Sequence, residues 1–380
     1  MAQTDTPLGL YVHWPYCARI CPYCDFNVYK SRGADDTLFE AILDDLRGWA
    51  HRTPNRQLVS LHLGGGTPSL MKADQIARLI DTAGDLFGFV EGAEIGLEAN
   101  PNDHDRFFDY ETAGINRLSL GVQSFQDKAL TSLGRDHDGA AARAALEIAR
   151  NTFASVSIDL IYAREGQSPP DWEKELNTAL ALGLDHLSLY QLTIEPGTAF
   201  AKRAERGDLV PPGETNAEQM YRITQALCAE AGLEAYEISN HGRKGHHSRH
   251  NRLYWEGGDW IGIGPGAHGR IGSHTSGGRV SSAAELRPSD YCQHVLTLGI
   301  GGSAETLSPL DEARERILMG IRISDGLKLS HLEALTGCNI DETQAAGFIN
   351  EGWLVREGEQ IRLTGDGRLL ADGIANALCP

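Results

Sequence analysis

Three closely spaced cysteines, Cys17, Cys21 and Cys24, form a C-x3-C-x2-C motif that could bind metal. They directly follow an apolar run at residues 8–14, which predicts a strand, so the thiols lie in the loop that leaves its carboxyl end. Three thiolates can hold three corners of a cubane [4Fe–4S] cluster and leave one iron open, as a reactive metal centre requires. Zinc with His13 as a fourth ligand is an alternative. A disulfide suits an odd number of clustered thiols poorly.

Further candidate ligands lie where the next predicted strands end. Consecutive glycines at residues 64–66, before Thr67, let a backbone approach a ligand closely, although they also suit a tight turn. Polar residues end the following strands: Glu98 and Asn100, then Gln123, then Asp159, and finally Tyr190 and Gln191. Because the chemistry of parallel barrels lies on loops at the strand carboxyl ends, we expect these residues to surround one site.

The elements that must position these residues alternate along residues 30–240. Strands are predicted at residues 8–14, 58–63, 94–99, 116–120, 154–160 and 186–190, and helices at 35–51, 73–87, 139–150, 172–182 and 214–231. This alternation predicts a parallel sheet of the α/β class, and six such units fit a partial (β/α)6 barrel.

The rest of the chain departs from this alternation, and we predict three domains. Residues 1–232 form the barrel, and residues 233–304 form a glycine- and histidine-rich accessory region. Residues 305–380 show three helices, a two-stranded wing and a closing helix, which is a winged-helix pattern.

Charge and hydropathy limit the classes of partner. The 380 residues carry a formal net charge of −18, and residues 305–380 hold 13 acidic and 7 basic residues, a net of −6. This sign disfavours nucleic acid, and with it a winged-helix regulator that uses a cluster as a sensor. No stretch approaches the roughly 20 apolar residues of a membrane span, and the first residues lack a signal pattern. We therefore expect a cytoplasmic protein.

Seven motifs then occur in an order that indicates a family. They are Tyr11-x5-Cys17, Gly64-Gly-Gly-Thr-Pro68, Glu98-Ala-Asn-Pro101, Leu118-Ser-Leu-Gly-Val-Gln-Ser-Phe125, Gly134-Arg135, Ser157-Ile-Asp-Leu-Ile-Tyr162 and Gly262-Ile-Gly-Pro-Gly-Ala-His-Gly269. Together they resemble the oxygen-independent coproporphyrinogen III oxidase (HemN) family of radical S-adenosylmethionine (SAM) proteins, including its heme chaperone branch, over essentially the whole chain. The resemblance implies that SAM binds the open iron and is cleaved by an electron from the cluster, which an electron donor must supply.

The resemblance also assigns roles to individual residues. It makes Cys17, Cys21 and Cys24 the cluster ligands. It gives Tyr11, Gly65 and Glu98 contacts to the cluster-bound SAM, and it gives a second SAM site to Tyr23, Gly66, Thr67, Gln123, Arg135 and Asp159. Carboxylates can accept hydrogen bonds from ribose or ammonium groups, and Arg135 suits a carboxylate. Glu98, Gln123 and Asp159 could instead form a salt-bridge ring inside the barrel. Whether one or two SAM molecules bind stays open.

Two departures separate the chain from the oxidases. The fourth cysteine of the oxidase motif is replaced by Phe26, and Tyr11 stands almost at the start of the sequence, without the long preceding segment. An HNxxYW motif at residues 250–255 resembles the chaperone branch. We therefore predict a heme chaperone that hands heme to an acceptor protein and does not oxidise coproporphyrinogen III. The alternative is the oxidase of porphyrin biosynthesis.

The surroundings of the HNxxYW motif predict the heme site. His250 is the predicted axial ligand, with His246 and His247 as competitors. Heme propionates would be neutralised by Arg243, Lys244, Arg249 and Arg252, and apolar walls would come from Tyr254, Trp255 and Trp260. The alternative interpretation is an ordinary polar surface loop.

Overall fold

A central sheet organises the molecule in the computed structural model, which describes residues 6–31, 33, 35–273, 277–335 and 338–380. Its twelve strands run in the order β14-β13-β12-β11-β1-β4-β5-β6-β7-β8-β10-β9. Six of them are neighbours and parallel, namely β1 (Leu8–Trp14), β4 (Leu58–Gly65), β5 (Phe89–Ala99), β6 (Arg117–Gln123), β7 (Ser155–Tyr162) and β8 (His186–Gln191). The predicted partial (β/α)6 barrel is confirmed.

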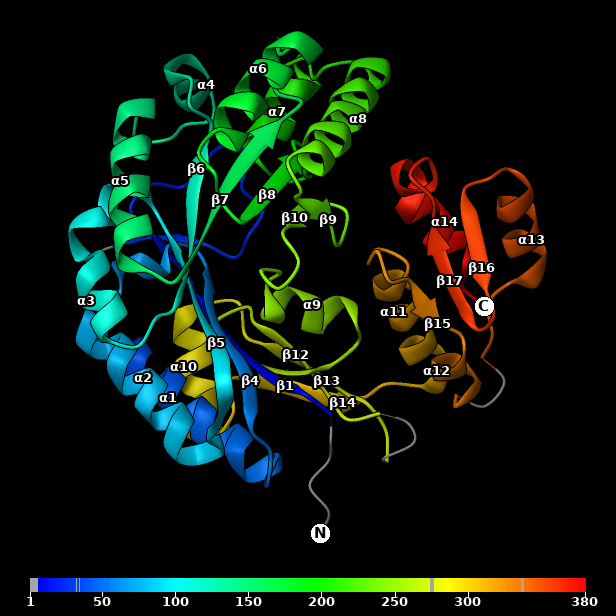
Figure 1. Cartoon of the computed structure of the whole chain (residues 1–380). Coiled ribbons are helices and arrows are strands. Elements are labelled where there is room, and N and C mark those ends of the chain that lie inside the picture. Colours follow the sequence, from blue (N-terminus) through cyan, green and yellow to red (C-terminus); the bar gives the residue numbers. More distant parts are fainter. Residues whose placement is uncertain (1–5, 32, 34, 274–276, 336–337) are drawn as a thin grey trace.

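Helices cover the outer face of this curved sheet (Figure 1). They include α1 (Asp36–Arg52), α2 (Ala73–Phe87), α3 (Phe107–Thr112), α5 (Gly139–Thr152), α6 (Pro169–Leu180) and α8 (Glu214–Glu230). In α1, the Asp35 side chain accepts a hydrogen bond from the Leu38 amide and caps the helix. The helical spacing of Leu38, Ile42 and Leu46 buries one face of α1 completely.

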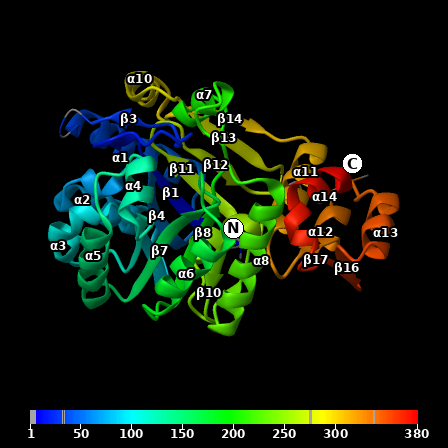
Figure 2. The same ribbon diagram turned by 90° about the horizontal axis from the view of Figure 1, so that it is seen from above.

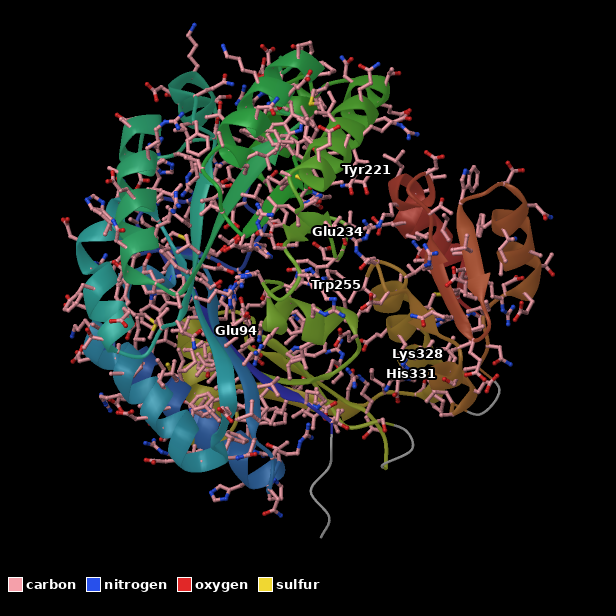
Figure 3. The ribbon with its side chains drawn as sticks, viewed as in Figure 1. Glu94, Tyr221, Glu234, Trp255, Lys328 and His331 are labelled. Atoms are coloured by element: carbon pink, nitrogen blue, oxygen red, sulfur yellow. The ribbon has the colours of Figure 1, made fainter. Side chains whose placement is uncertain are left out.

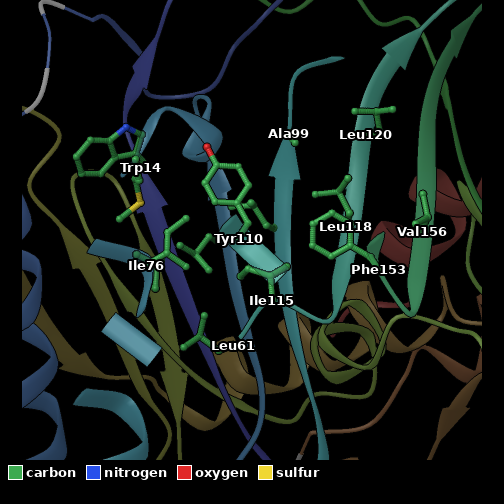
Figure 4. Packing of buried hydrophobic residues seen from close by; sticks show 14 of the residues in the cluster. Trp14, Leu61, Ile76, Ala99, Tyr110, Ile115, Leu118, Leu120, Phe153 and Val156 are labelled. Carbon is green, nitrogen blue, oxygen red and sulfur yellow. The ribbon is translucent and has the colours of Figure 1, made fainter. Parts of the chain in front are cut away.

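Strand alternation separates an apolar outer face from a polar inner face. In β4, Leu61 and Leu63 belong to the buried apolar cluster that packs under the helices, part of which Figure 4 shows. Ser60 and His62 lie at the alternate positions and therefore point to the other face. The inside of the barrel is thus lined by polar side chains, which can either hold a ligand or bind another segment of the chain.

The predicted accessory region continues the sheet at both ends. The strand β11 (Asp259–Ile263) pairs parallel with β1, and β12 (His268–Ile271), β13 (Val280–Ala284) and β14 (Gly302–Thr306) follow it in antiparallel order. At the other end, β10 (Asn240–Gly242) pairs with β8 and β9 (Glu234–Ala235). The region also contains α9 (Arg249–Trp255) and α10 (Pro288–Leu298). These pairings cross the predicted boundary at residue 232, and the three-domain division stays a proposal.

The C-terminal part has a core of its own. Its helices α11 (Pro309–Gly320), α12 (Ser330–Glu333), α13 (Glu342–Asn350) and α14 (Ala371–Leu378) pack on a small sheet of β15 (Leu327–Lys328), β17 (Gln360–Leu363) and β16 (Leu354–Glu357). The winged-helix-like pattern is therefore present, with β15 added to the expected wing. Figures 1 and 2 both place this part beside α8, where Arg222 donates to Asp366 over 2.7 Å. Among the described residues, no helix is long and apolar enough to cross a bilayer.

Candidate functional site at the carboxyl ends of the strands

One cavity of about 340 Å³ lies at the carboxyl ends of the parallel strands. Eleven of the thirteen predicted site residues line it: Cys17, Cys21, Tyr23, Cys24, Gly65, Gly66, Thr67, Glu98, Gln123, Arg135 and Asp159. The two that do not are Tyr11 and His250. The lining residues come from the cysteine loop, from four parallel strands and from the segments that follow those strands, and Tyr190 and Gln191 at the end of β8 line the same cavity.

Backbone hydrogen bonds fix the shape of the cysteine loop. The Cys24 amide donates to the Cys21 carbonyl over 3.2 Å and closes a turn, and the Ser31 amide donates to the Cys17 carbonyl over 2.8 Å. None of the three thiols forms a disulfide. The loop therefore presents three sulfur ligands on a backbone that is already fixed.

Arg135 supplies positive charge next to these thiols. Its guanidinium donates to Cys21 Sγ over 3.5 Å and to the Gly121 carbonyl over 3.0 Å, while its buried Nε has no partner within the described part of the chain. Burial raises the pKa of the Cys24 thiol to about 11 and also raises the pKa of Cys17. Metal binding must therefore displace protons from these thiols, and Arg135 favours the thiolates that result.

The glycine segment allows close approach between two parts of the protein. Gly65 has a φ of +101°, and a Cβ on Gly66 would lie 2.7 Å from the Tyr16 carbonyl oxygen. The amides of Gly66 and Thr67 donate to the carbonyls of Trp14 and Tyr16 over 2.7 and 2.8 Å. These two amides are therefore used within the protein, and the segment supports the cysteine loop.

Two carboxylates face the cavity and have different partners. Glu98 Oε1 lies 3.1 Å from His62 Nε2, and Asp159 accepts a hydrogen bond from Ser119 Oγ over 3.0 Å. Burial, followed by the nearby negative charge of Glu98, raises the pKa of Asp159 to about 6. The partners of Glu98 and Asp159 are thus a histidine and a serine. A salt-bridge ring of Glu98, Gln123 and Asp159, the alternative raised by the sequence, is not required to explain how the two carboxylates are held. They give the cavity acidic groups suited to a cationic ligand.

Several lining residues were missed by sequence reasoning. Ser119 and Gly121 line the cavity with Gln123, four and two residues before it on the same face of β6, so strand periodicity was the available signal. Gln123 itself has a left-handed φ of 64°, a strained backbone of the kind found at functional sites. Thr193 and Glu195 also line the cavity, and no periodic pattern pointed to them because they follow the last parallel strand.

Tyr11 and His250 lie below the cavity in a packed stack of rings. The ring centroids of His62 and His250 are 5.1 Å apart, and Tyr11 lies 6.4 Å from His62 and 6.3 Å from His250. The two ring nitrogens of His250 are 2.8 Å from Ser60 Oγ and 2.7 Å from Tyr254 Oη, and the residue is only 3% exposed. Neither ring nitrogen of His250 is therefore free in this conformation, and its role as an axial heme ligand stays a prediction.

Three of the four cations predicted around His250 have partners within the protein, whereas Lys244 is exposed. Arg243 pairs with Asp185 at 3.1 Å, Arg249 donates to the Gly92 carbonyl, and Arg252 pairs with Glu256 and Asp325. Trp260, an expected wall of the heme site, is buried as part of the sheet. Because α9 packs against β4, the segment is not a simple surface loop, and the heme site predicted there stays a prediction.

His13 does not fit the zinc alternative. Its Nδ1 lies 3.0 Å from Tyr11 Oη, and its Nε2 lies 3.0 Å from the Asn27 carbonyl oxygen. Both ring nitrogens are therefore engaged away from the thiols. A fourth zinc ligand from this residue would require both hydrogen bonds to break.

Comparisons with known proteins agree with this architecture. The model of the radical SAM superfamily matches residues 11–179, and that of the HemN C-terminal domain matches residues 307–370. The heme chaperone HemW of Mycobacterium tuberculosis is 36% identical over 98% of this chain and 95% of its own, and HemW of Escherichia coli is 32% identical over 97% of both. The mitochondrial radical S-adenosyl methionine domain-containing protein 1 of Danio rerio is 36% identical over 96% of this chain and 85% of its own.

A solved structure shows the same fold. Coproporphyrinogen III oxidase (HemN) from Escherichia coli matches with a TM-score of 0.81 over 99% of this chain and 90% of that one, at 24% identity. The partial barrel, with three cysteines in a loop at its strand ends, is that of a radical SAM protein. Within that superfamily, the chain belongs to the HemW family.

Proposed function

We propose that this protein is a heme chaperone that binds a [4Fe–4S] cluster, SAM and heme and transfers heme to an acceptor protein. The observation that carries the proposal is the cavity of about 340 Å³ in which the cysteine loop meets the polar ends of five strands. The proposal requires two partners, the acceptor and an electron donor for the cluster. A cytoplasmic location stays a prediction.

The donor set fits a cluster. Cys17, Cys21 and Cys24 offer three thiolates from one hydrogen-bonded loop, and Arg135 offsets negative charge at Cys21. A bound [4Fe–4S] cluster would supply an open iron for SAM and an electron for its reductive cleavage.

The carboxylates supply the complementary surface for SAM, which carries a sulfonium and an ammonium. Glu98 is held by His62 at one side of the cavity, and Asp159 is held by Ser119 at another. Gly65 and Gly66 leave room beside the cysteine loop, and Gln123 and Tyr23 complete the lining. These residues would bind and orient SAM, whereas Tyr11 would act on it only through the ring stack.

Phe26 favours the chaperone over the oxidase. It stands where the oxidase motif has a fourth cysteine, lines the cavity and is 60% exposed. An aromatic side chain cannot provide the thiol chemistry of a cysteine there. Relatives at 32–36% identity over nearly the whole chain are named heme chaperone HemW. The alternative remains oxygen-independent coproporphyrinogen III oxidase, whose fold the chain shares.

Anaerobic reconstitution followed by two parallel incubations tests the proposal. Reconstituted protein should hold about four irons per chain, and Cys21→Ser should lose the cluster absorbance, whereas the matched control Cys292→Ser should keep it. With heme, the protein should bind stoichiometrically and pass heme on. With coproporphyrinogen III, SAM and reductant, no product should form. Steady multi-turnover formation of protoporphyrinogen would establish the oxidase instead.

A further inference from the structure

A second cavity, of about 330 Å³, lies between the end of α9 and the C-terminal part. We call it the Trp255 cavity, after the last residue of the HNxxYW motif, and it is also lined by Ile323, Leu327, Lys328 and His331. Figure 3 shows Trp255 on α9, with Lys328 and His331 on the facing C-terminal part. A cavity of this size between two packed units of a protein is a common setting for a ligand.

The Trp255 cavity is lined by one indole and two aliphatic side chains, together with the charged and polar groups Glu256, Arg316, Asp325 and Gln360. Ile323 and Leu327 are buried, so they form a fixed apolar floor. Trp255 is held in place because its Nε1 donates to Asn251 Oδ1 over 2.9 Å and the Arg322 guanidinium lies 5.3 Å from its ring centroid. A fixed indole beside apolar side chains suits a flat, largely apolar ligand.

The cations of the cavity differ in their availability. Arg316 is paired with Glu312 at 2.7 Å, while the lining carboxylates Glu256 and Asp325 both pair with Arg252, which lies outside the lining. Lys328 has no ion pair or hydrogen-bonding side-chain partner within the described residues, and it is exposed at the rim. An anionic group at the edge of a ligand would therefore meet an available ammonium.

His331 is the histidine best placed to bind a metal in such a ligand. It lines the cavity, is exposed, and has no hydrogen-bond or ion-pair partner in the part of the chain that the structure describes. By contrast, His250 has both nitrogens engaged, His241 is buried against Gln225, and His247 stacks on Tyr236 at 4.4 Å.

We propose that the Trp255 cavity is the heme site, with His331 as an axial ligand, Lys328 at a propionate and Trp255 against the macrocycle. This inference rests on the proposed function, since it assigns the place where the chaperone holds heme. The rim residues Lys328 and His331 are exposed, so part of the macrocycle would stay accessible to an acceptor. That arrangement suits a protein that must release heme as well as bind it.

Hemin titration of the cluster-reconstituted full chain, followed by Soret absorbance, tests this site. His331→Ala should weaken heme binding about tenfold or more and shift the Soret maximum, because an axial ligand is lost. Lys328→Gln should weaken binding a few-fold without moving the maximum, because it removes only a charge. The matched control is His246→Ala, since His246 is also exposed but lies outside the cavity. Cluster absorbance and circular dichroism should be the same in all four proteins.

The outcomes separate this inference from the proposed function. If the parent binds heme and His331→Ala and Lys328→Gln bind it with the parent's affinity and spectrum, the Trp255 cavity is not the site. Loss of binding in His246→Ala, with His331→Ala unaffected, would also overturn the assignment. If the parent itself binds no heme, the chaperone function fails, and this inference fails with it.

Discussion

Glu98 is the carboxylate of the cavity that the protein positions through a second side chain. His62 Nε2 lies 3.1 Å from Glu98 Oε1, and the His62 ring is held by its stack with His250. Gly96 makes room for it, because a Cβ there would lie 2.6 Å from His62 Nδ1. The HNxxYW motif therefore supports the cavity from below, through the ring of His62.

Removal of His62 should accordingly weaken SAM binding. We expect His62→Ala to lower SAM affinity about tenfold, roughly 1.4 kcal/mol, because Glu98 loses the partner that fixes its orientation. His62→Gln, whose amide can still donate, should retain most of the affinity. Calorimetry should also show that His62→Ala causes little further loss of SAM affinity in a protein that already carries Glu98→Gln. Equal losses in both backgrounds would mean that His62 acts on SAM binding by another route.

At the scale of elements, α9 is fixed by a carboxylate from the main sheet. Glu94, in β5, accepts hydrogen bonds from the backbone amides of Arg249 and His250 at 2.9 and 3.0 Å, and from Ser248 Oγ at 2.9 Å. These are donors at the start of α9, which have no partner within the helix itself. One buried side chain thus holds the HNxxYW motif inside the barrel.

Substitution of Glu94 should therefore be costly to the fold. We expect Glu94→Ala to lower the free energy of unfolding by about 3 kcal/mol, because it leaves several buried donors and the nearby Arg117 cation without their partner. Glu91, which is exposed on the same strand, provides the control. Glu91→Ala should change the free energy of unfolding by less than about 0.5 kcal/mol. Denaturant unfolding measures both. Similar midpoints for the two variants would show that α9 is held by other contacts.

At the scale of the whole molecule, Asp45 joins distant parts of the chain. It is fully buried in α1, and it accepts hydrogen bonds from Tyr291 Oη at 2.7 Å and from the Gly301 amide at 3.0 Å. Tyr291 Oη in turn accepts from the Gly264 amide at 2.9 Å. This network holds α10 and the segment just before β14 against α1, the first helix of the barrel.

The Asp45 network should make stability depend on pH. Burial raises the pKa of Asp45 to about 7, whereas an unfolded aspartate titrates near 3.9. Between these values the folded state binds more protons than the unfolded state, so its stability falls as pH rises. From pH 5 to 8 we expect a loss on the order of 2 kcal/mol that Asp45→Asn does not show. Denaturant unfolding from pH 5 to 8 measures how the stability of the parent and of Asp45→Asn depends on pH. If the two proteins lose stability in parallel, Asp45 is not the group responsible.

The sequence by itself determined the features that are encoded over short distances. Helical spacing and strand alternation predicted the six barrel units and the winged-helix-like part, since each signal is complete within a few turns or a few residues. The cysteine spacing and strand-end positions predicted that these residues would share a site, because parallel strands end at one edge. The structure brings eleven of them to one cavity, and their roles there stay predictions.

Tertiary structure decided which side chains remain available for binding. The sequence places His250 in a polar segment as a candidate heme ligand, but it does not reveal the residue's partners. Ser60 lies 190 residues away, and Glu94, which binds the His250 amide, lies in β5. The Trp255 cavity likewise exists only because α9 meets a part of the chain about 70 residues later. A residue's type and spacing are local properties, whereas its burial and free hydrogen-bonding capacity depend on groups that only the folded chain brings into contact.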